Sequence, residues 1–304
     1  MNARATTGET TTRGESLPST LRLREAHLTV TDLDRSLAFY DRSLGLRNHW
    51  RDGPVAGLGA GGEDILVLHE QPAARPAGRH AGLYHVALLH PSRHELARAA
   101  LRLAVTQTRI RGASDHGISE AIYLFDPDGN ELELAADRPR EVWPDLSRGF
   151  DGGPLPLDTQ ALLALVASEE PRPHADPALR VGHVHVHVGD IEEGLHFYRD
   201  AVGFEVMTLM PTAAFVSVGG YHHHLAFNTW RGEGVPSVPP GTVGLRHWTI
   251  ELDTPDRVEQ VASRVRAAGY DVEQRADGVL VRDPWDIPLL LAVQAAASRA
   301  TALA

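Results

Sequence analysis

The chain has 304 residues, enough for two domains of ordinary size. Hydrophobic residues make up 42% of it and charged residues 23%, values typical of a soluble globular protein, and it contains no run of 18 apolar residues that could span a membrane. The formal charge of −11 argues against nucleic acid as a partner, because phosphate binding needs a basic surface. The absence of cysteine excludes disulfides and thiolate metal ligands, and we expect a cytoplasmic protein.

The N-terminal part of the chain changes from a polar segment to a regular pattern. Residues 1–19 are rich in Thr, Gly and Glu, and we expect a flexible tail there. Polar and apolar residues alternate over 23–30, which predicts a β-strand. A helix is predicted over 32–46, because Asp32 can cap its start and Gly45 can end it.

The strand and helix pattern recurs along the chain. It returns near residue 183, and each half contains a further copy that opens at Gly82 or Gly244. Further helices are predicted around 92–104 and 255–268, and short strands separated by turn signals follow each helix. The sequence therefore predicts an α+β fold of four βαβββ modules.

We expect the modules to pair in chain order. This pairing gives an N-terminal domain over 20–138 and a C-terminal domain over 179–294. Residues 139–178, which hold several Pro and Gly, are predicted to be a linker with one short helix at 158–168.

Histidines cluster on three predicted strands. His183, His185 and His187 alternate with valines and share one strand face. A second cluster occupies 222–224, where neighbouring residues point to opposite faces, and His247 lies on a third strand. Neutral imidazole is the commonest protein ligand of first-row transition metals, so we expect these strands to converge on one ion.

Two segments carry a family resemblance. Asp-Leu-Asp-Arg-Ser-Leu-Ala-Phe-Tyr-Asp-Arg-Ser-Leu-Gly-Leu at 32–46 and Asp-Pro-Asp-Gly-Asn-Glu-Leu-Glu-Leu at 126–134 resemble the vicinal oxygen chelate superfamily. That superfamily includes glyoxalase I, bleomycin-resistance proteins and extradiol ring-cleaving dioxygenases. The segments 112–116 and 219–224 look like the two-domain bacterial catechol 2,3-dioxygenase-like group. The resemblance covers about 20–295 and implies two cup-shaped, glyoxalase-like domains.

The resemblance also implies where a metal would bind. In the C-terminal cup the ligand positions fall on His183, His224 and His247, while Leu290 stands where the family often has Glu. We favour this set, because the working metal of four-module extradiol enzymes lies in the C-terminal half. An alternative N-terminal set of ligands and neighbouring residues consists of Glu25, His85 and Glu133, with His116 and Tyr123 beside them.

Two more histidines are predicted to take part. His223 matches the acid/base histidine of extradiol enzymes, and His185 could orient a ligand. The assignments of His223 and His224 require opposite strand faces unless a bulge intervenes, so both remain open. Core packing is the simpler alternative for His247 and His85, and a polar edge position for Glu133.

The resemblance suggests three functions. The first is ring cleavage of a catechol-like aromatic by O₂ at a divalent metal, Fe(II) by preference. The second is a glyoxalase-like lyase, isomerase or transferase that uses Zn, Ni or Mn without O₂. The third is a cup that binds an aromatic or a drug without turnover. The predicted partners are a small aromatic substrate and O₂, and a homo-oligomer is a possible assembly.

Overall fold

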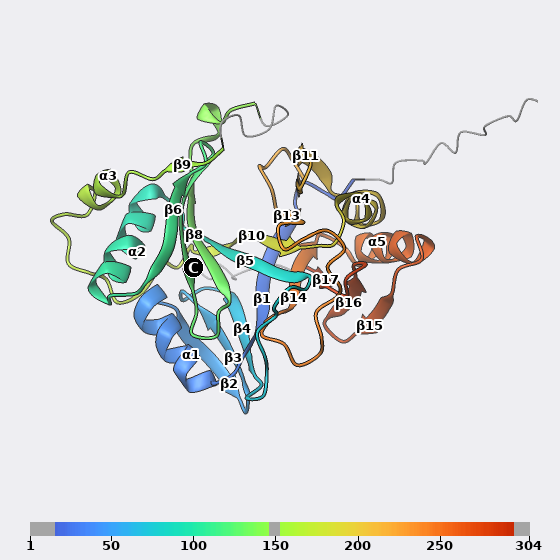
Figure 1. The fold of residues 1–304 in the computed structure, drawn as a ribbon, viewed down its shortest axis with the longest axis horizontal. Coiled ribbons are helices and arrows are strands. Elements are labelled where there is room, and N and C mark those ends of the chain that lie inside the picture. Colours follow the sequence, from blue (N-terminus) through green and yellow to red (C-terminus); the bar gives the residue numbers. More distant parts are fainter. Residues whose placement is uncertain (1–15, 146–152, 295–304) are drawn as a thin grey trace, which may run out of the picture.

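The computed structural model describes residues 16–145 and 153–294, which form two mixed β-sheets with helices outside them (Figure 1). Most of the predicted tail, residues 1–15, lies outside the described residues. Its last part is packed, because Leu17 is buried and its N–H donates to the carbonyl of Gly203. Within the described residues, the helices are all too short or too polar to cross a membrane.

The first sheet has eight strands. Its order is β15 (Val272–Arg275), β16 (Gly278–Arg282), β17 (Pro288–Val293), β14 (Gly244–Leu252), β1 (Arg22–Val30), β4 (Asp64–Glu70), β3 (Val55–Gly59) and β2 (Arg47–Asp52). The two central strands, β1 and β14, run antiparallel. The sheet therefore joins the first predicted module to the fourth.

The second sheet has nine strands. Its order is β11 (Glu205–Met210), β12 (Ala213–Ser217), β13 (Leu225–Asn228), β10 (Arg180–His187), β5 (Gly82–Leu89), β8 (Glu131–Asp137), β7 (Ser119–Phe125), β6 (Ile110–Asp115) and β9 (Leu155–Pro156). Its centre is the antiparallel pair of β5 and β10. This sheet joins the second module to the third.

The four modules thus exist as predicted, but their partners differ from those expected from chain order. Neither the segment 20–138 nor the segment 179–294 forms a sheet of its own, since the central pairs β1·β14 and β5·β10 both cross between them. In Figure 1, β1 in blue lies beside β14 in orange, and β5 in cyan lies beside β10 in yellow. The physical reason is that the first strand of a module can pair with the first strand of any other module.

The helices begin and end close to the predicted positions. Each module helix has a side-chain cap that accepts the backbone N–H three residues on, from Asp32, Ser92, Asp190 and Thr254 in turn. The helices are α1 (Leu33–Phe39), α2 (Arg93–Val105), α4 (Ile191–Leu195) and α5 (Pro255–Ala267). The segments η1 (Tyr40–Leu44) and η4 (His196–Val202) extend α1 and α4, and each ends at a left-handed glycine.

The described part of the linker packs on the second module. It contains the short helices η2 (Arg140–Val142) and α3 (Thr159–Ala164), and the strand β9 extends the second sheet. The guanidinium of Arg102 donates to the carbonyls of Arg172 and His174, which fixes the returning chain against α2.

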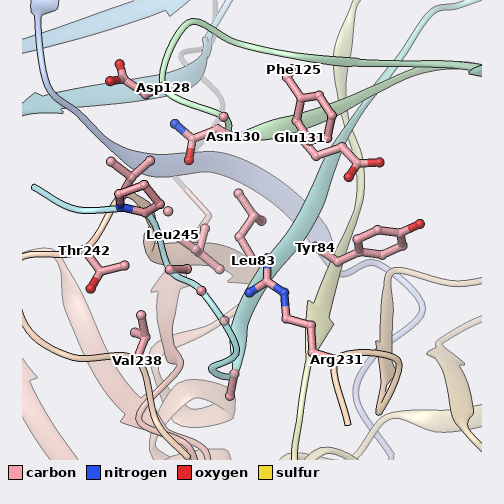
Figure 2. A pocket seen from close by; sticks show the side chains of 18 residues that line it. Leu83, Tyr84, Phe125, Asp128, Asn130, Glu131, Arg231, Val238, Thr242 and Leu245 are labelled. Atoms are coloured by element: carbon pink, nitrogen blue, oxygen red, sulfur yellow. The ribbon is translucent and has the colours of Figure 1, made fainter. Parts of the chain in front are cut away.

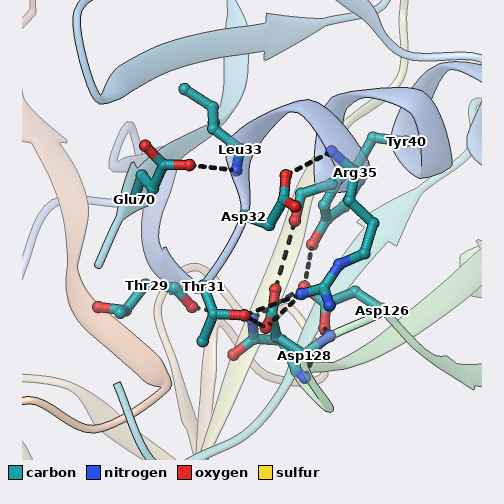
Figure 3. Close-up of polar contacts among 11 residues, drawn as sticks. Thr29, Thr31, Asp32, Leu33, Arg35, Tyr40, Glu70, Asp126 and Asp128 are labelled. Atoms are coloured by element: carbon teal, nitrogen blue, oxygen red, sulfur yellow. Dashed lines mark hydrogen bonds and ion pairs between the residues drawn. The ribbon is translucent and has the colours of Figure 1, made fainter. Parts of the chain in front are cut away.

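A buried Tyr–Asp hydrogen bond ties each extended helix to the last turn of the next module. Tyr40 donates to Asp126 Oδ2 at 3.0 Å, within the polar network at the start of α1 that Figure 3 shows. Tyr198 repeats this contact with Asp283 Oδ2 at 2.9 Å. Both tyrosines are fully buried. The predicted Asp-Pro turns are therefore structural anchors between modules.

The two anchors differ in one donor. Asp126 Oδ2 also receives the side-chain amide of Asn130 at 2.8 Å, whereas Ile287 stands at the matching place in the second turn and has no such group. We therefore expect Tyr198→Phe to lower the free energy of unfolding by about 1–3 kcal/mol and Tyr40→Phe by less. Urea unfolding measures both values. Tyr270→Phe is the control, and equal losses in all three variants would contradict the assignment.

The second anchor also predicts a pH dependence. Burial raises the pKa of Asp283 from its ordinary value to about 7. A carboxyl whose pKa is raised by folding stabilises the protein at low pH, and this contribution is lost as the pH rises through the folded pKa. Tyr198→Phe removes a donor to the carboxylate and raises that pKa further, so its loss of stability should be larger at pH 8 than at pH 6.

Candidate metal centre

Three buried side chains meet at the centre of the second sheet. The antiparallel pairing of β5 with β10 places His85 opposite His185 and diagonal to His183, and β8 runs parallel to β5 and carries Glu133. His85 Nε2 lies 3.0 Å from Glu133 Oε2 and 3.2 Å from His183 Nε2. His183 Nε2 lies 3.2 Å from the same carboxylate oxygen. The three donor atoms therefore form a nearly equilateral triangle.

This triangle fits a transition-metal ion. Two ligand atoms about 2.1 Å from one ion stand about 3.0–3.4 Å apart at right or tetrahedral angles. Two histidines and one carboxylate on one face, with the other positions open, are the usual protein ligands of mononuclear non-haem Fe(II). Within residues 16–145 and 153–294, this is the one group of three or more His, Asp or Glu whose donor atoms converge so closely.

The electrostatics of the triangle favour a cation. Burial alone would raise the pKa of Glu133, but the charges of His183 and His85 and their hydrogen bonds outweigh burial and hold that pKa well below its ordinary value. The carboxylate is thus ionised in a fully buried position. A divalent ion would neutralise it and occupy the nitrogens that face it.

A cavity of about 440 Å³ opens onto the triangle. Its walls combine the three clustered residues with aromatic and apolar side chains, among them Tyr84, Tyr123, Met210, Phe215 and Trp230. Arg111 also lines it and lies 5.9 Å above the ring of Tyr84. A planar aromatic molecule has both the size and the apolar character to enter this space.

The predicted acid/base histidine lies at this cavity. The ring centroid of His223 is 4.1 Å from that of His183, and His223 lines the cavity. Its Nδ1 lies 2.8 Å from Nδ1 of His222, whose Nε2 lies 3.0 Å from Asp137 Oδ1. Burial, and then the neighbouring His183, lower the pKa of His223 well below its ordinary value, so it is neutral near pH 7.

Two further predicted residues border the same space. His185 lines the cavity, and its Nε2 accepts from the side-chain amide of Asn228 at 2.8 Å. The oxygen of that amide accepts from His187 Nδ1 at 2.8 Å, so Asn228 fixes both rings. The sequence does not predict this role of Asn228, because its position two residues before Trp230 carries no motif.

His116 and Tyr123 also lie together at the cavity, 2.8 Å apart between Nε2 and the phenol oxygen. They were predicted to accompany His85 and Glu133, and they line the same space as these two residues. The structure thus brings His183 of the preferred ligand set together with four residues of the alternative set, namely His85, Glu133, His116 and Tyr123.

The other predicted ligands lie elsewhere. His224 Nδ1 bonds Ser217 Oγ at 2.7 Å, and His224 lines a separate cavity with Arg24 and Arg180. His247 is on β14 of the first sheet, where it stacks on His27, and Glu25 is on β1. The exchange of module partners explains His247 and Glu25, because it places β14 and β1 in the first sheet, whereas His224 precedes β13 of the second sheet and lines a different cavity.

A second, smaller cavity of about 210 Å³ shares Tyr84 with the first one. Figure 2 shows Tyr84, Glu131 and Arg231 along one side of it. Burial lowers the pKa of Arg231. Its guanidinium donates to the carbonyl of His80. Tyr84 therefore stands between a polar cavity and the cavity of the metal triangle.

The chain matches the model of a known protein superfamily. The model of the glyoxalase/bleomycin resistance protein/dioxygenase superfamily matches residues 22–134 and 180–284, more than half of the chain. The chain belongs to this superfamily.

A particular relative is similar over most of its length. Catechol-2,3-dioxygenase of Bacillus subtilis is 38% identical over 265 residues, which are 85% of this chain and 92% of that protein. This relationship makes the chain an enzyme of the dioxygenase type.

Solved structures share the fold at low identity. A candidate dioxygenase from Bacillus subtilis has a TM-score of 0.61 at 12% identity, over 92% of this chain and 86% of that one. Glyoxalase I from Zea mays has a TM-score of 0.58 at 18% identity, over 90% of this chain and 92% of that one. At these identities, the two similarities show that the fold is shared.

The triangle predicts which variants lose metal. In protein purified without oxygen, His85→Ala, Glu133→Ala and His183→Ala should each lower the metal content by about one ion per chain, because each removes a ligand. His224→Ala is the matched control and should keep the wild-type content. Elemental analysis with circular dichroism of each variant measures this. Metal lost with His224→Ala but kept with Glu133→Ala would contradict the assignment.

Proposed function

We propose that this enzyme cleaves the ring of a catechol-like aromatic with O₂, using Fe(II) held by His85, His183 and Glu133. The observation that carries the proposal is the triangle of two imidazoles and one carboxylate, with donor atoms 3.0–3.2 Å apart, at the floor of a largely apolar cavity. The similarity to a catechol-2,3-dioxygenase over 85% of the chain supports the same reaction.

When bound there, Fe(II) would supply a Lewis acid for the two substrate hydroxyls and a redox centre for O₂. The protein's own residues provide the rest of the site. Phe215 and Trp230 bound the cavity and exclude water from the ring of the substrate. Glu133 is buried, and its negative charge lowers the net charge of the metal with its ligands. The set of three histidines favoured from the sequence carries no such charge.

The hydrogen bonds around His223 make it a base. The carboxylate of Asp137 accepts from His222 Nε2, so a neutral His222 offers its Nδ1 as an acceptor. His223 Nδ1 then donates to it, which leaves His223 Nε2 without a proton and free for the substrate. His223 can therefore take a hydroxyl proton and return it later. Burial lowers its pKa, which keeps it neutral before the substrate binds.

Oxygen uptake tests the proposed function. Iron-loaded protein should consume about one O₂ per catechol and form a ring-opened product, whereas Glu133→Ala should do neither. The matched control is His224→Ala, which should retain the reaction. Activity with bound zinc or nickel and without O₂ would replace the proposal by a glyoxalase-like reaction. Binding of catechol that is unchanged by metal removal would point to a binding protein.

The tautomer argument predicts two further variants. His223→Gln should lower kcat by about 10²–10⁴-fold with the metal content retained, because the base is lost. Asp137→Ala should also lower kcat, since nothing then holds His222 in the required tautomer. Asp137→Asn keeps an acceptor oxygen and should restore much of the rate. Steady-state oxygen uptake measures these effects, and a loss confined to KM would contradict the assignment.

A further inference from the structure

We propose that the smaller cavity, of about 210 Å³, binds a short aliphatic acid that also carries a hydroxyl group. In this site Arg231 holds the carboxylate of the ligand, and the amide oxygen of Asn130 accepts from its hydroxyl. The site is separate from the metal triangle, because none of the three triangle residues lines the smaller cavity. It is distinct from the proposed ring cleavage and does not depend on it.

The smaller cavity lies where four parts of the chain meet. Leu83 comes from β5 of the second sheet, and Leu245 comes from β14 of the first. Asn130 stands in the turn before β8, and Arg231 follows β13. In the view of Figure 2, Leu83 and Leu245 lie between Asn130 and Arg231. The space thus has a polar group at either end and alkyl side chains between them, which a short hydroxy acid matches.

Asn130 provides an acceptor that has no donor. The residue is 2% exposed, and its Nδ2 donates to the carbonyl of Thr29 at 3.2 Å and to Asp126 Oδ2 at 2.8 Å. These two bonds determine which side of the amide carries the oxygen. Its Oδ1 is buried without a hydrogen-bond partner in the described residues, and in Figure 2 it points towards Leu245. A buried acceptor without a donor is costly, so we expect an O–H group of a ligand there.

Arg231 provides a cation that has no anion. Its guanidinium donates to the carbonyl of His80 at 3.1 Å, and within residues 16–145 and 153–294 it forms no ion pair. Burial lowers the pKa of Arg231 more than the negative charge of Glu131 raises it. Guanidinium groups bind carboxylates through two parallel N–H bonds, so a carboxylate is the group that this position favours.

Two carboxylates also line the smaller cavity, but each has a cation of its own. Glu131 pairs with Arg111, and Asp128 lies 2.6 Å from Arg35. Among the described residues that line this cavity, Arg231 is therefore the one charged residue without a charged partner. Its positive charge is the net charge of the lining, which favours an anionic ligand over an amine.

The apolar middle of the smaller cavity selects the ligand further. Leu83 and Val243 line it and are 8% and 7% exposed. Methylene groups of a ligand leave water when they contact these side chains, which adds to the binding free energy. Phosphate and sulfate have no apolar part and gain nothing from this contact. The expected ligand class is therefore an aliphatic hydroxy acid of few carbon atoms.

Saturation-transfer NMR titration of the full chain tests the proposal with three matched probes. 4-Hydroxybutyrate carries both polar groups, butyrate lacks the hydroxyl and 1,4-butanediol lacks the carboxylate. 4-Hydroxybutyrate should bind saturably. Butyrate should bind about three- to tenfold more weakly, because Asn130 Oδ1 keeps no donor. 1,4-Butanediol should bind more weakly by about tenfold or more, because Arg231 keeps no anion.

Variants of Arg231 test the other end of the site. Arg231→Gln should weaken the binding of 4-hydroxybutyrate by about tenfold or more, and Arg231→Lys should weaken it less, because the charge is retained. Arg79→Gln is the matched control and should bind as the wild type does. Arg79 is exposed and donates to the backbone carbonyl of Arg231, but it does not line the cavity. At the Asn130 end the probe is varied instead, because Asn130 also holds its turn through Asp126.

Glu133→Gln separates this site from the proposed function. This variant should bind 4-hydroxybutyrate as the wild type does, although the metal triangle has lost a ligand. Binding that is lost in Glu133→Gln and kept in Arg231→Gln would place the acid at the triangle and overturn the proposal. A wild type without saturable binding would also overturn it. Equal affinities for butyrate and 4-hydroxybutyrate would do the same, because the hydroxyl would then have no acceptor in the site.

Discussion

The site depends first on the antiparallel pairing of β5 with β10. This pairing alone brings a histidine of the second module against a histidine of the third, since His85 and His183 are 98 residues apart in sequence. The parallel strand β8 then supplies Glu133 beside them. The triangle is therefore a product of contact between modules, and no single module could bind the ion.

Local structure follows from local signals, and the sequence predicts it well. The caps Asp32 and Ser92 and the terminal glycine Gly45 mark helices that the structure has within one or two residues. The choice of module partners has no such signal. The first strands β1, β5, β10 and β14 all offer the same alternating edge, so either pairing satisfies their hydrogen bonds. Only packing over the whole chain decides between them, and that information is not local.

The same distinction explains what the sequence predicted of the site. The family resemblance implied that His85, His183 and Glu133 are ligand positions, but chain order divided them between two domains. The facing of the 222–224 cluster was open. In the structure residues 222–224 precede the strand β13 and are not part of it, and there His223 borders the metal cavity while His224 lines a different one. Asn228 and Trp230 carried no signal, because Asn228 acts through its hydrogen bonds to His185 and His187, and Trp230 acts through the cavity that it lines.

The exchange of partners also explains why Leu290 lies apart from the metal triangle. Leu290 pairs with Thr249 in the first sheet, as Glu133 pairs with Ala87 in the second. Leu290 and Glu133 are therefore equivalent positions of different sheets. The carboxylate that His183 requires comes from the facing module, and Leu290 lies in the sheet of His247. In that sheet Glu25 is on β1, two strands away from Leu290 on β17. One sheet thus holds two histidines and one carboxylate beside a cavity of about 440 Å³, whereas the other has Glu25, His247 and Leu290 at the equivalent positions.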